Sequence, residues 1–218
     1  MIALVDINNF YVSCERLFNP KLINKPIVVL SNNDGCIISR SEEAKSIGIK
    51  MGTPLFKAQS LINQHKVKVL SSNYPLYADI SSRVMRLVSE FTAHQEVYSI
   101  DECFINLAGH NNHQDIAATI KEKLWMNLRM PVCVGIGPTK VLAKFGNHCA
   151  KKQSDWNGIC LTSLLSDKFI NAVMNEFSVN KVWGVGKKLT QKLNLMNIYS
   201  VLDLKKSNAI HIKSELNI

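Results

Sequence analysis

Two adjacent acids interrupt a strand-forming stretch between Tyr98 and Leu107. Asp101 and Glu102 are the only charged residues of this run, whose other members are mainly apolar and aromatic. The composition predicts a β-strand or a hairpin, although acids are depleted from strands and an unpaired buried carboxylate is costly. Because successive strand side chains point to opposite faces, both acids can serve one site only near a strand end or a kink. The alternative interpretation is a solvated turn acid beside a salt-bridged one.

The N-terminal segment supplies a third acid in a similar setting. Residues 1–7 form a short apolar run in which Asp6 is the only charged side chain, which predicts a buried strand that ends at a sheet edge. The run is too short for the apolar core of a signal peptide and has no basic leader. Three carboxylates from separate strands supply the oxygen ligands that Mg2+ requires. With two ions, such a site can clamp the attacking and leaving oxygens of a phosphoryl transfer.

The net charge of +9 is unevenly distributed along the 218 residues. Residues 1–138 contain 14 basic and 12 acidic residues, whereas residues 139–218 contain 12 lysines and 5 acids. This basic C-terminal third suits a phosphate-backbone partner; a generic solvated lysine surface is the alternative. The six cysteines have no metal-ligand spacing, and no apolar run has membrane-spanning length. These features predict a reduced, cytoplasmic protein without a membrane segment.

Hydrophobic periodicity predicts a chain of mixed helices and strands. Apolar residues recur at three- and four-residue intervals over 74–92, the strongest helical pattern present. Further helices are predicted over 10–18, 41–48, 115–129 and 140–152, and strands over 2–7, 26–31, 36–39 and 131–136. The Asn-Asn-Asp-Gly sequence at 32–35 predicts a tight hairpin. The order of these elements fits a split βαβ unit with its helices on one face.

Several motifs, in order along the chain, resemble the Y-family translesion DNA polymerases, most closely the catalytic subunit of the bacterial polymerase V (UmuC) type. The matching stretches are Asp6–Glu15, Lys25–Cys36, Ser71–Tyr74, Tyr98–Glu102, Val134–Lys140 and Val182–Gly186. The resemblance implies an α+β fold with three parts, which are a ferredoxin-like palm (1–10 and 74–162), a small α/β fingers insertion (11–73) and a helical helix-hairpin-helix thumb (163–218). It also implies that the thumb is incomplete and that the family's little finger domain is absent.

The resemblance assigns the three acids to a two-metal site. Asp6, Asp101 and Glu102 would be catalytic and would bind two Mg2+ ions together with the backbone carbonyl of Ile7. The implied nucleotide-binding residues are Asn8, Asn9, Phe10, Tyr11, Ser39, Lys45 and Lys151. Among them, Tyr11 would be the steric gate beneath the sugar, and Lys151 would neutralise the triphosphate. Core packing is the alternative for the two aromatic residues. Lys140 and Lys144 are expected to be structural or surface lysines.

One position pair departs from the common family pattern. Many relatives carry Tyr-x-x-Arg on the helix after the hairpin, where this chain has Glu42 and Lys45. Lys45 can still meet a phosphate as a point charge, without the bidentate fork of arginine. Glu42 is not expected to bind phosphate. The polymerase V type shares this departure, so it indicates a subtype more than a loss of activity.

The expected thumb carries a sequence-independent DNA-binding motif. Gly184 and Gly186 would let backbone N–H groups approach a DNA phosphate, and Lys187 and Lys188 add positive charge. The implied partners are primer-template DNA and a deoxynucleoside triphosphate. The resemblance further implies a UmuD-type accessory protein, a recombinase filament and a sliding clamp as candidate protein partners.

The leading hypothesis from the sequence is a DNA-directed DNA polymerase core for error-prone translesion synthesis in DNA repair and the SOS response. A hypothesis of a different class is a catalytically weak, truncated chain that binds DNA or a partner protein. A phosphatase based on Asp6 is disfavoured, because that chemistry commonly uses Asp-x-Asp and Asn8 cannot act as the acid.

Overall fold

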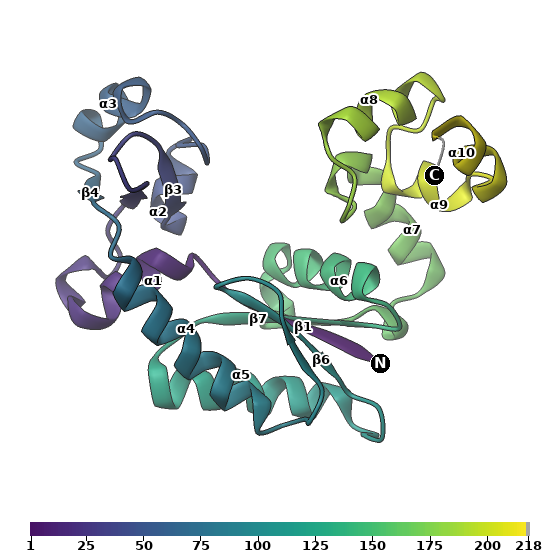
Figure 1. Ribbon diagram of the computed structural model, residues 1–218, viewed down its shortest axis with the longest axis horizontal. Coiled ribbons are helices and arrows are strands. Elements are labelled where there is room, and N and C mark those ends of the chain that lie inside the picture. Colours follow the sequence, from purple (N-terminus) through teal and green to yellow (C-terminus); the bar gives the residue numbers. More distant parts are fainter. Residues whose placement is uncertain (217–218) are drawn as a thin grey trace.

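The structure, a computed structural model, describes residues 1–216 and is built around a five-stranded sheet (Figure 1). Its strands are β1 (Ile2–Ile7), β5 (Gln95–Val97), β6 (Glu102–Asn106), β7 (Val132–Gly137) and β8 (Ile159–Leu161). They lie in the order β5-β6-β1-β7-β8. The central strand β1 pairs antiparallel with β6 and β7, whereas β7 and β8 are parallel. β1 and β7 are buried along most of their length, in keeping with their continuous apolar sequences.

Helices cover both faces of this sheet. The three long ones are α4 (Tyr74–Ser89), α5 (His113–Leu128) and α6 (Lys140–Lys152). α4 and α5 lie on one face, where Val5 and Val134 point into the main hydrophobic core. α6 lies on the opposite face, where Leu4 clusters with Ala143 (Figure 1). The α+β class is confirmed, but the prediction that all of these helices share one face is wrong for α6.

The contact between α6 and β7 depends on Gly135. A Cβ at this position would lie 2.0 Å from the backbone nitrogen of Asn147 and 2.2 Å from the carbonyl oxygen of Ala143. Only glycine therefore allows α6 to lie directly on the backbone of β7. α6 is the crossover between the parallel strands β7 and β8, a connection that needs a helix-length segment.

A smaller three-stranded sheet is inserted between α1 and α4, in the order β3-β2-β4. The elements of this region are α1 (Phe10–Phe18), β2 (Ile27–Leu30), β3 (Ile37–Arg40), α2 (Glu42–Ser46), α3 (Leu55–Gln64) and β4 (Lys68–Leu70). The predicted hairpin is present, since β2 and β3 are antiparallel and Asp34 in the turn has a φ of 50°. The small sheet has a hydrophobic core of its own, which contains Val28, Leu30 and Ile37.

Short helices make up the C-terminal part of the described chain. They are α7 (Asp167–Glu176), α8 (Lys187–Leu195), α9 (Val201–Lys206) and α10 (Ala209–Leu216), and Val179, Leu193 and Ile198 lie in their core. The assignment of the three parts as palm, fingers and thumb stays a prediction. Two predicted helix ends shift: the helix predicted over 74–92 ends at Ser89, and Asn112 rather than Asp115 caps α5. Within residues 1–216, no helix is both long and apolar enough to cross a membrane.

Candidate active site

Asp6, Asp101 and Glu102 meet at one edge of the main sheet. Asp6 is opposite Glu102 in the register of β1 and β6. Asp101 lies in the bend that joins β5 to β6, and its carbonyl oxygen accepts a hydrogen bond of 2.8 Å from the N–H of Ile7. This bend is the kink that two adjacent acids need in order to serve one site, because β6 begins only at Glu102 and strict alternation does not apply before it.

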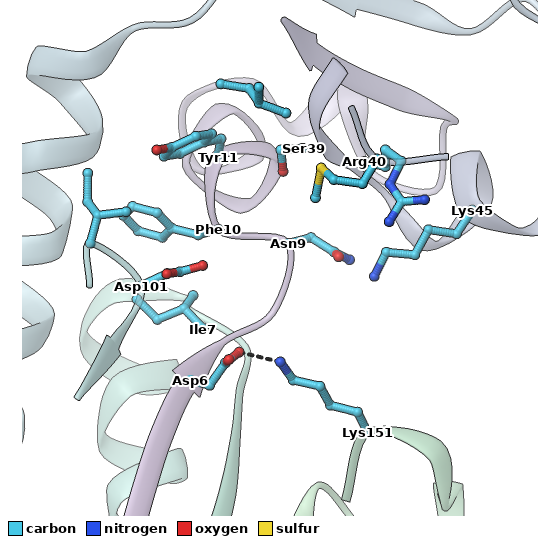
Figure 2. Close-up of a pocket in the computed structure, with 13 residues that line it drawn as sticks. Asp6, Ile7, Asn9, Phe10, Tyr11, Ser39, Arg40, Lys45, Asp101 and Lys151 are labelled. Atoms are coloured by element: carbon cyan, nitrogen blue, oxygen red, sulfur yellow. Dashed lines mark hydrogen bonds and ion pairs between the residues drawn. The ribbon is translucent and has the colours of Figure 1, made fainter. Parts of the chain in front are cut away.

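Two cavities flank the Asp6 carboxylate. The first, called here the Asp101 pocket, has a volume of about 280 Å³ and is lined by Asp6, Asp101 and Lys151 among others (Figure 2). The second, called the Glu102 pocket, has a volume of about 400 Å³ and is lined by Asp6 and Glu102 on one side and the segment around Trp183 on the other. Asp6 therefore shares one cavity with each of the other two acids.

Two lysines of α6 pair with these acids. Lys151 Nζ lies 2.5 Å from Asp6 Oδ1, and Lys144 Nζ lies 2.9 Å from Glu102 Oε1. Burial raises the pKa of Asp6 to about 6; Lys151 opposes this shift, and the charges of Asp101 and Glu102 add to it. The raised pKa indicates that ionising Asp6 is costly here, which favours the presence of further positive charge.

The donors at this edge suit a hard divalent cation, because carboxylate oxygens are the ligands that Mg2+ prefers. The Asp101 carboxylate also accepts a hydrogen bond of 2.6 Å from Ser99 Oγ. Among the described residues, no three His, Cys, Asp or Glu side chains already converge in the geometry of a metal centre. To bind an ion, Asp6 and Glu102 would exchange their lysine partners for it.

Tyr11 lies on the opposite wall of the Asp101 pocket from the acids (Figure 2). Its ring stacks on Tyr77 with a centroid distance of 4.4 Å and an interplanar angle of 16°, and it meets Tyr74 edge-on with a centroid distance of 6.0 Å. Tyr77 is held in turn by a hydrogen bond of 2.7 Å from its hydroxyl to Glu15. Phe10 also lines this pocket, although it is 3% exposed and belongs to the main core. A contact between either aromatic residue and a nucleotide stays a prediction.

Most of the other predicted nucleotide contacts also line the Asp101 pocket. They are Asn9 just before α1, Ser39 on β3 and Lys45 on α2. Glu42, the residue that departs from the family pattern, accepts hydrogen bonds from Lys45 Nζ at 2.7 Å and from Asn9 Nδ2 at 2.9 Å. Glu42 thus positions two pocket residues.

Asn8 is the one predicted nucleotide-binding residue that does not line the Asp101 pocket. Its Nδ2 donates to Cys133 Sγ at 3.3 Å, and its Oδ1 is buried without a partner among the described residues. The side chain lines a separate cavity, which Lys151 also lines. A contact between Asn8 and a nucleotide stays a prediction.

Lys144 and its aromatic neighbours are functional candidates that the sequence did not reveal. Lys144 Nζ lies 4.4 Å from the ring centroid of Tyr98 and 5.3 Å from that of Trp183, and Trp183 Nε1 donates to Tyr98 Oη at 3.0 Å. One feature could have indicated its place: Lys144 precedes Lys151 by seven residues, two turns of a helix, so both share a face. Lys140 instead pairs with Glu96 at the surface.

The predicted DNA-binding residues lie at the start of α8. Gly184 has a φ of 91° and lines the Glu102 pocket, and Gly186 is the N-cap of the helix. Lys187 and Lys188 are exposed in its first turn. Backbone N–H groups at the start of a helix and nearby lysine charges both favour phosphate binding. A contact between these residues and DNA stays a prediction.

The fold is similar to that of solved Y-family DNA polymerases. A family model described as "IMS: impB/mucB/samB family" matches residues 5–148, and the chain belongs to this family. The matched range contains all three acids, so the resemblance inferred from the motifs is confirmed.

Individual proteins of this family are similar to the chain over its whole length. The chain is 40% identical over 221 residues to Protein SamB of Salmonella typhimurium and 42% identical over 223 residues to Protein UmuC of Salmonella typhimurium. Both alignments cover 100% of this chain and 52% of the relative, so the chain spans about half the length of these proteins. Among solved structures, the insertion ternary complex of Dbh DNA polymerase is similar, with a TM-score of 0.81 and 26% identity over 99% of this chain and 63% of that one.

Proposed function

We propose that this chain is the core of a DNA-directed DNA polymerase of the error-prone translesion type. The observation that carries the proposal is the position of Asp6, which shares one cavity with Asp101 and another with Glu102. The Asp101 pocket would hold the incoming deoxynucleoside triphosphate and the Glu102 pocket the primer terminus. The reacting atoms would then meet beside the three acids, and holding them there lowers the entropic part of the barrier.

Asp6, Asp101 and Glu102, with the carbonyl of Ile7, would hold two Mg2+ ions. Such ions lower the pKa of the primer 3′-hydroxyl and neutralise the charge of the leaving phosphates. In the proposed reaction the 3′-oxygen bonds to the α-phosphorus and releases its proton to solvent. The bond between the α-phosphorus and the bridging oxygen breaks, and that oxygen leaves with pyrophosphate.

Lys45 and Lys151 would bind the phosphates of the nucleotide in the Asp101 pocket, with Tyr11 beneath the sugar and Asn9 and Ser39 along the wall. The ion pair between Lys151 and Asp6 supports this arrangement, because it can exchange partners. A phosphate takes the lysine while a cation takes the carboxylate, so that neither charge is left uncompensated.

Primer-template DNA would run from the Glu102 pocket to the start of α8, where Gly184, Gly186, Lys187 and Lys188 would bind a backbone phosphate. The family alone supports the other elements of the proposal. These are the SOS role, the cytoplasmic location, and the UmuD-type, recombinase and clamp partners.

Asp101→Asn tests this function. We expect the variant to lose at least 100-fold in the rate of primer extension with Mg2+, because removing a metal ligand removes transition-state charge stabilisation, while DNA binding is retained. Asp79→Asn, which changes an exposed acid on α4, is the matched control. Extension at the wild-type rate would remove Asp101 from the mechanism. If the wild-type chain binds DNA but does not extend a primer, the alternative of a DNA- or partner-binding role holds.

A further inference from the structure

A third cavity, called here the Lys121 pocket, shares Lys45 and Lys151 with the Asp101 pocket but is lined by none of the three acids. It has a volume of about 450 Å³, and Asn9, Lys45 and Lys151 line both it and the Asp101 pocket. The two lysines extend from α2 and α6 into the Asp101 pocket, where Lys151 reaches Asp6 (Figure 2). The phosphate end of the proposed nucleotide site therefore adjoins the Lys121 pocket.

Lys121 gives this cavity an uncompensated positive charge. The side chain is half-buried on α5, and Nζ donates to the carbonyl oxygen of Val132 at 2.8 Å. Among the described residues it forms no ion pair, and burial lowers its pKa. A buried charge without a counter-ion is costly, so an anion in the cavity would stabilise it.

The remaining lining favours an anion with several charges. Lys45, Lys121 and Lys151 face the cavity, and Glu42 is its one carboxylate among the described lining residues. Glu42 already accepts hydrogen bonds from Lys45 and Asn9, which offsets its charge. The side-chain amides of Gln153 and Asn157 supply further hydrogen-bond donors.

We propose that the Lys121 pocket binds inorganic pyrophosphate after it leaves the α-phosphorus. This inference rests on the proposed polymerase function, which produces pyrophosphate in the adjoining pocket. Lys45 and Lys151 would contact the product first and Lys121 would hold it next. The product would thereby leave on the side away from the primer, and the Asp101 pocket would be free for the next nucleotide.

The first test is calorimetric binding of sodium pyrophosphate to the chain in EDTA, where divalent ions cannot recruit it to the acids. We expect Lys121→Met to weaken binding at least tenfold. Lys123→Met is the matched control, since Lys123 lies on the same helix and pairs with Glu90; it should bind within twofold of wild type. Absent binding to wild type, or equal affinity in both variants and wild type, would overturn the inference.

A second variant leaves the fold contacts of Lys121 in place. Gln153→Glu adds a negative charge to the pocket from an exposed position at the end of α6, and we expect pyrophosphate to bind at least threefold more weakly. Gln64→Glu, at the exposed end of α3, is the control and should have no effect. Wild-type affinity in Gln153→Glu would contradict the site.

Primer extension by the same preparations separates this inference from the proposed function. Normal extension with pyrophosphate binding that is insensitive to Lys121 rejects the pocket and leaves the polymerase intact. Absent extension with Lys121-dependent binding rejects the polymerase and keeps the anion site. Deoxynucleotide binding with Mg2+ should change less than twofold in Lys121→Met; an equal loss for nucleotide and pyrophosphate would place Lys121 in the nucleotide site and overturn the inference.

Discussion

Burial and the ion pair with Lys151 have opposite effects on the Asp6 carboxylate. Its side chain is 15% exposed, and burial outweighs the attraction of Lys151 in setting its pKa. The neighbouring Asp101 and Glu102 charges act in the same direction as burial. A group of this kind costs stability when it ionises and gains from a bound cation. The residue most central to the proposed site is therefore a source of instability in the protein without a ligand.

The raised pKa of Asp6 predicts how the effect of Asp6→Asn on stability depends on pH. The pKa of Asp6 is raised from 3.8 to about 6 in the folded chain, so the folded state binds the proton more tightly than the unfolded state. In wild type, protonated Asp6 therefore contributes to the free energy of unfolding. This contribution is fully present below about pH 4 and is lost as the pH rises through 6. We expect the stability of Asp6→Asn relative to wild type to increase by about 1–3 kcal/mol between pH 4 and pH 7.

Urea unfolding in EDTA at both pH values measures this difference. Asp79→Asn, an exposed substitution, should show no comparable trend. A difference between wild type and Asp6→Asn that does not depend on pH would mean that the Asp6 pKa is not raised by folding.

Tyr11→Ala should admit ribonucleotides. The Tyr11 ring faces the pocket and is fixed by stacking on Tyr77, so it can block a 2′-hydroxyl without yielding. We expect the preference for deoxynucleotides over ribonucleotides, measured as the ratio of kcat/KM values, to fall by roughly tenfold or more, or ~1.4 kcal/mol. Phe18→Ala, at an exposed position on the same helix, is the control. An unchanged ratio would place the gate elsewhere.

At the scale of elements, α6 links packing to chemistry. One face of the helix lies on the bare backbone at Gly135, and the same helix presents Lys144 and Lys151 to the acids. Since both lysines are fixed to a rigid helix, their positions depend on how closely that helix approaches β7. Gly135, which itself lines neither the Asp101 pocket nor the Glu102 pocket, therefore controls the positions of the charges within them.

Gly135→Ala should displace this helix. The added Cβ would overlap the backbone of α6, which cannot move aside as a flexible side chain can. We expect a loss of more than about 3 kcal/mol in the free energy of unfolding, or failure to fold. Gly35→Ala, which has only Ser31 Oγ at 3.9 Å, should change stability by less than about 0.5 kcal/mol. Urea unfolding of both variants measures these changes. Similar losses of stability in Gly135→Ala and Gly35→Ala would show that the close contact between α6 and β7 does not explain the effect.

At the scale of the whole molecule, charge is separated along the chain. The C-terminal third holds 12 of the 26 basic residues and only 5 of the 17 acids. The exposed lysines at the start of α8 belong to this basic region. A duplex bound there would release counterions in proportion to the phosphates neutralised.

The double variant Lys187→Gln, Lys188→Gln tests this electrostatic contribution. We expect primer-template DNA to bind more weakly, with the slope of log K against log salt smaller by about 1 per lysine removed. Fluorescence anisotropy at several salt concentrations measures the slope. Lys21→Gln with Lys25→Gln, two exposed lysines after α1, is the control. An equal change of slope in both pairs would indicate general attraction without a site at α8.

The sequence predicted those features that arise from local chemistry. The strand at β1, the hairpin of β2 and β3, and the span of α6 follow from apolar periodicity and turn residues. It also predicted that Asp101 and Glu102 needed a kink. It misplaced α6 on the sheet, because the face that a crossover helix covers depends on strand order, and Gly135 and Gly137 mark the bare surface that receives it.

What the sequence alone determined is the set of groups available: three acids in apolar surroundings, a gate-like aromatic pair and a basic C-terminal third. The tertiary structure decided which of these groups meet. It paired Lys144 with Glu102, turned Asn8 away from the Asp101 pocket, and left Lys121 half-buried without a counter-ion among the residues that the structure describes. The physical reason is that charge interactions and burial depend on distances across the fold, and those distances are fixed by packing between elements far apart in the chain.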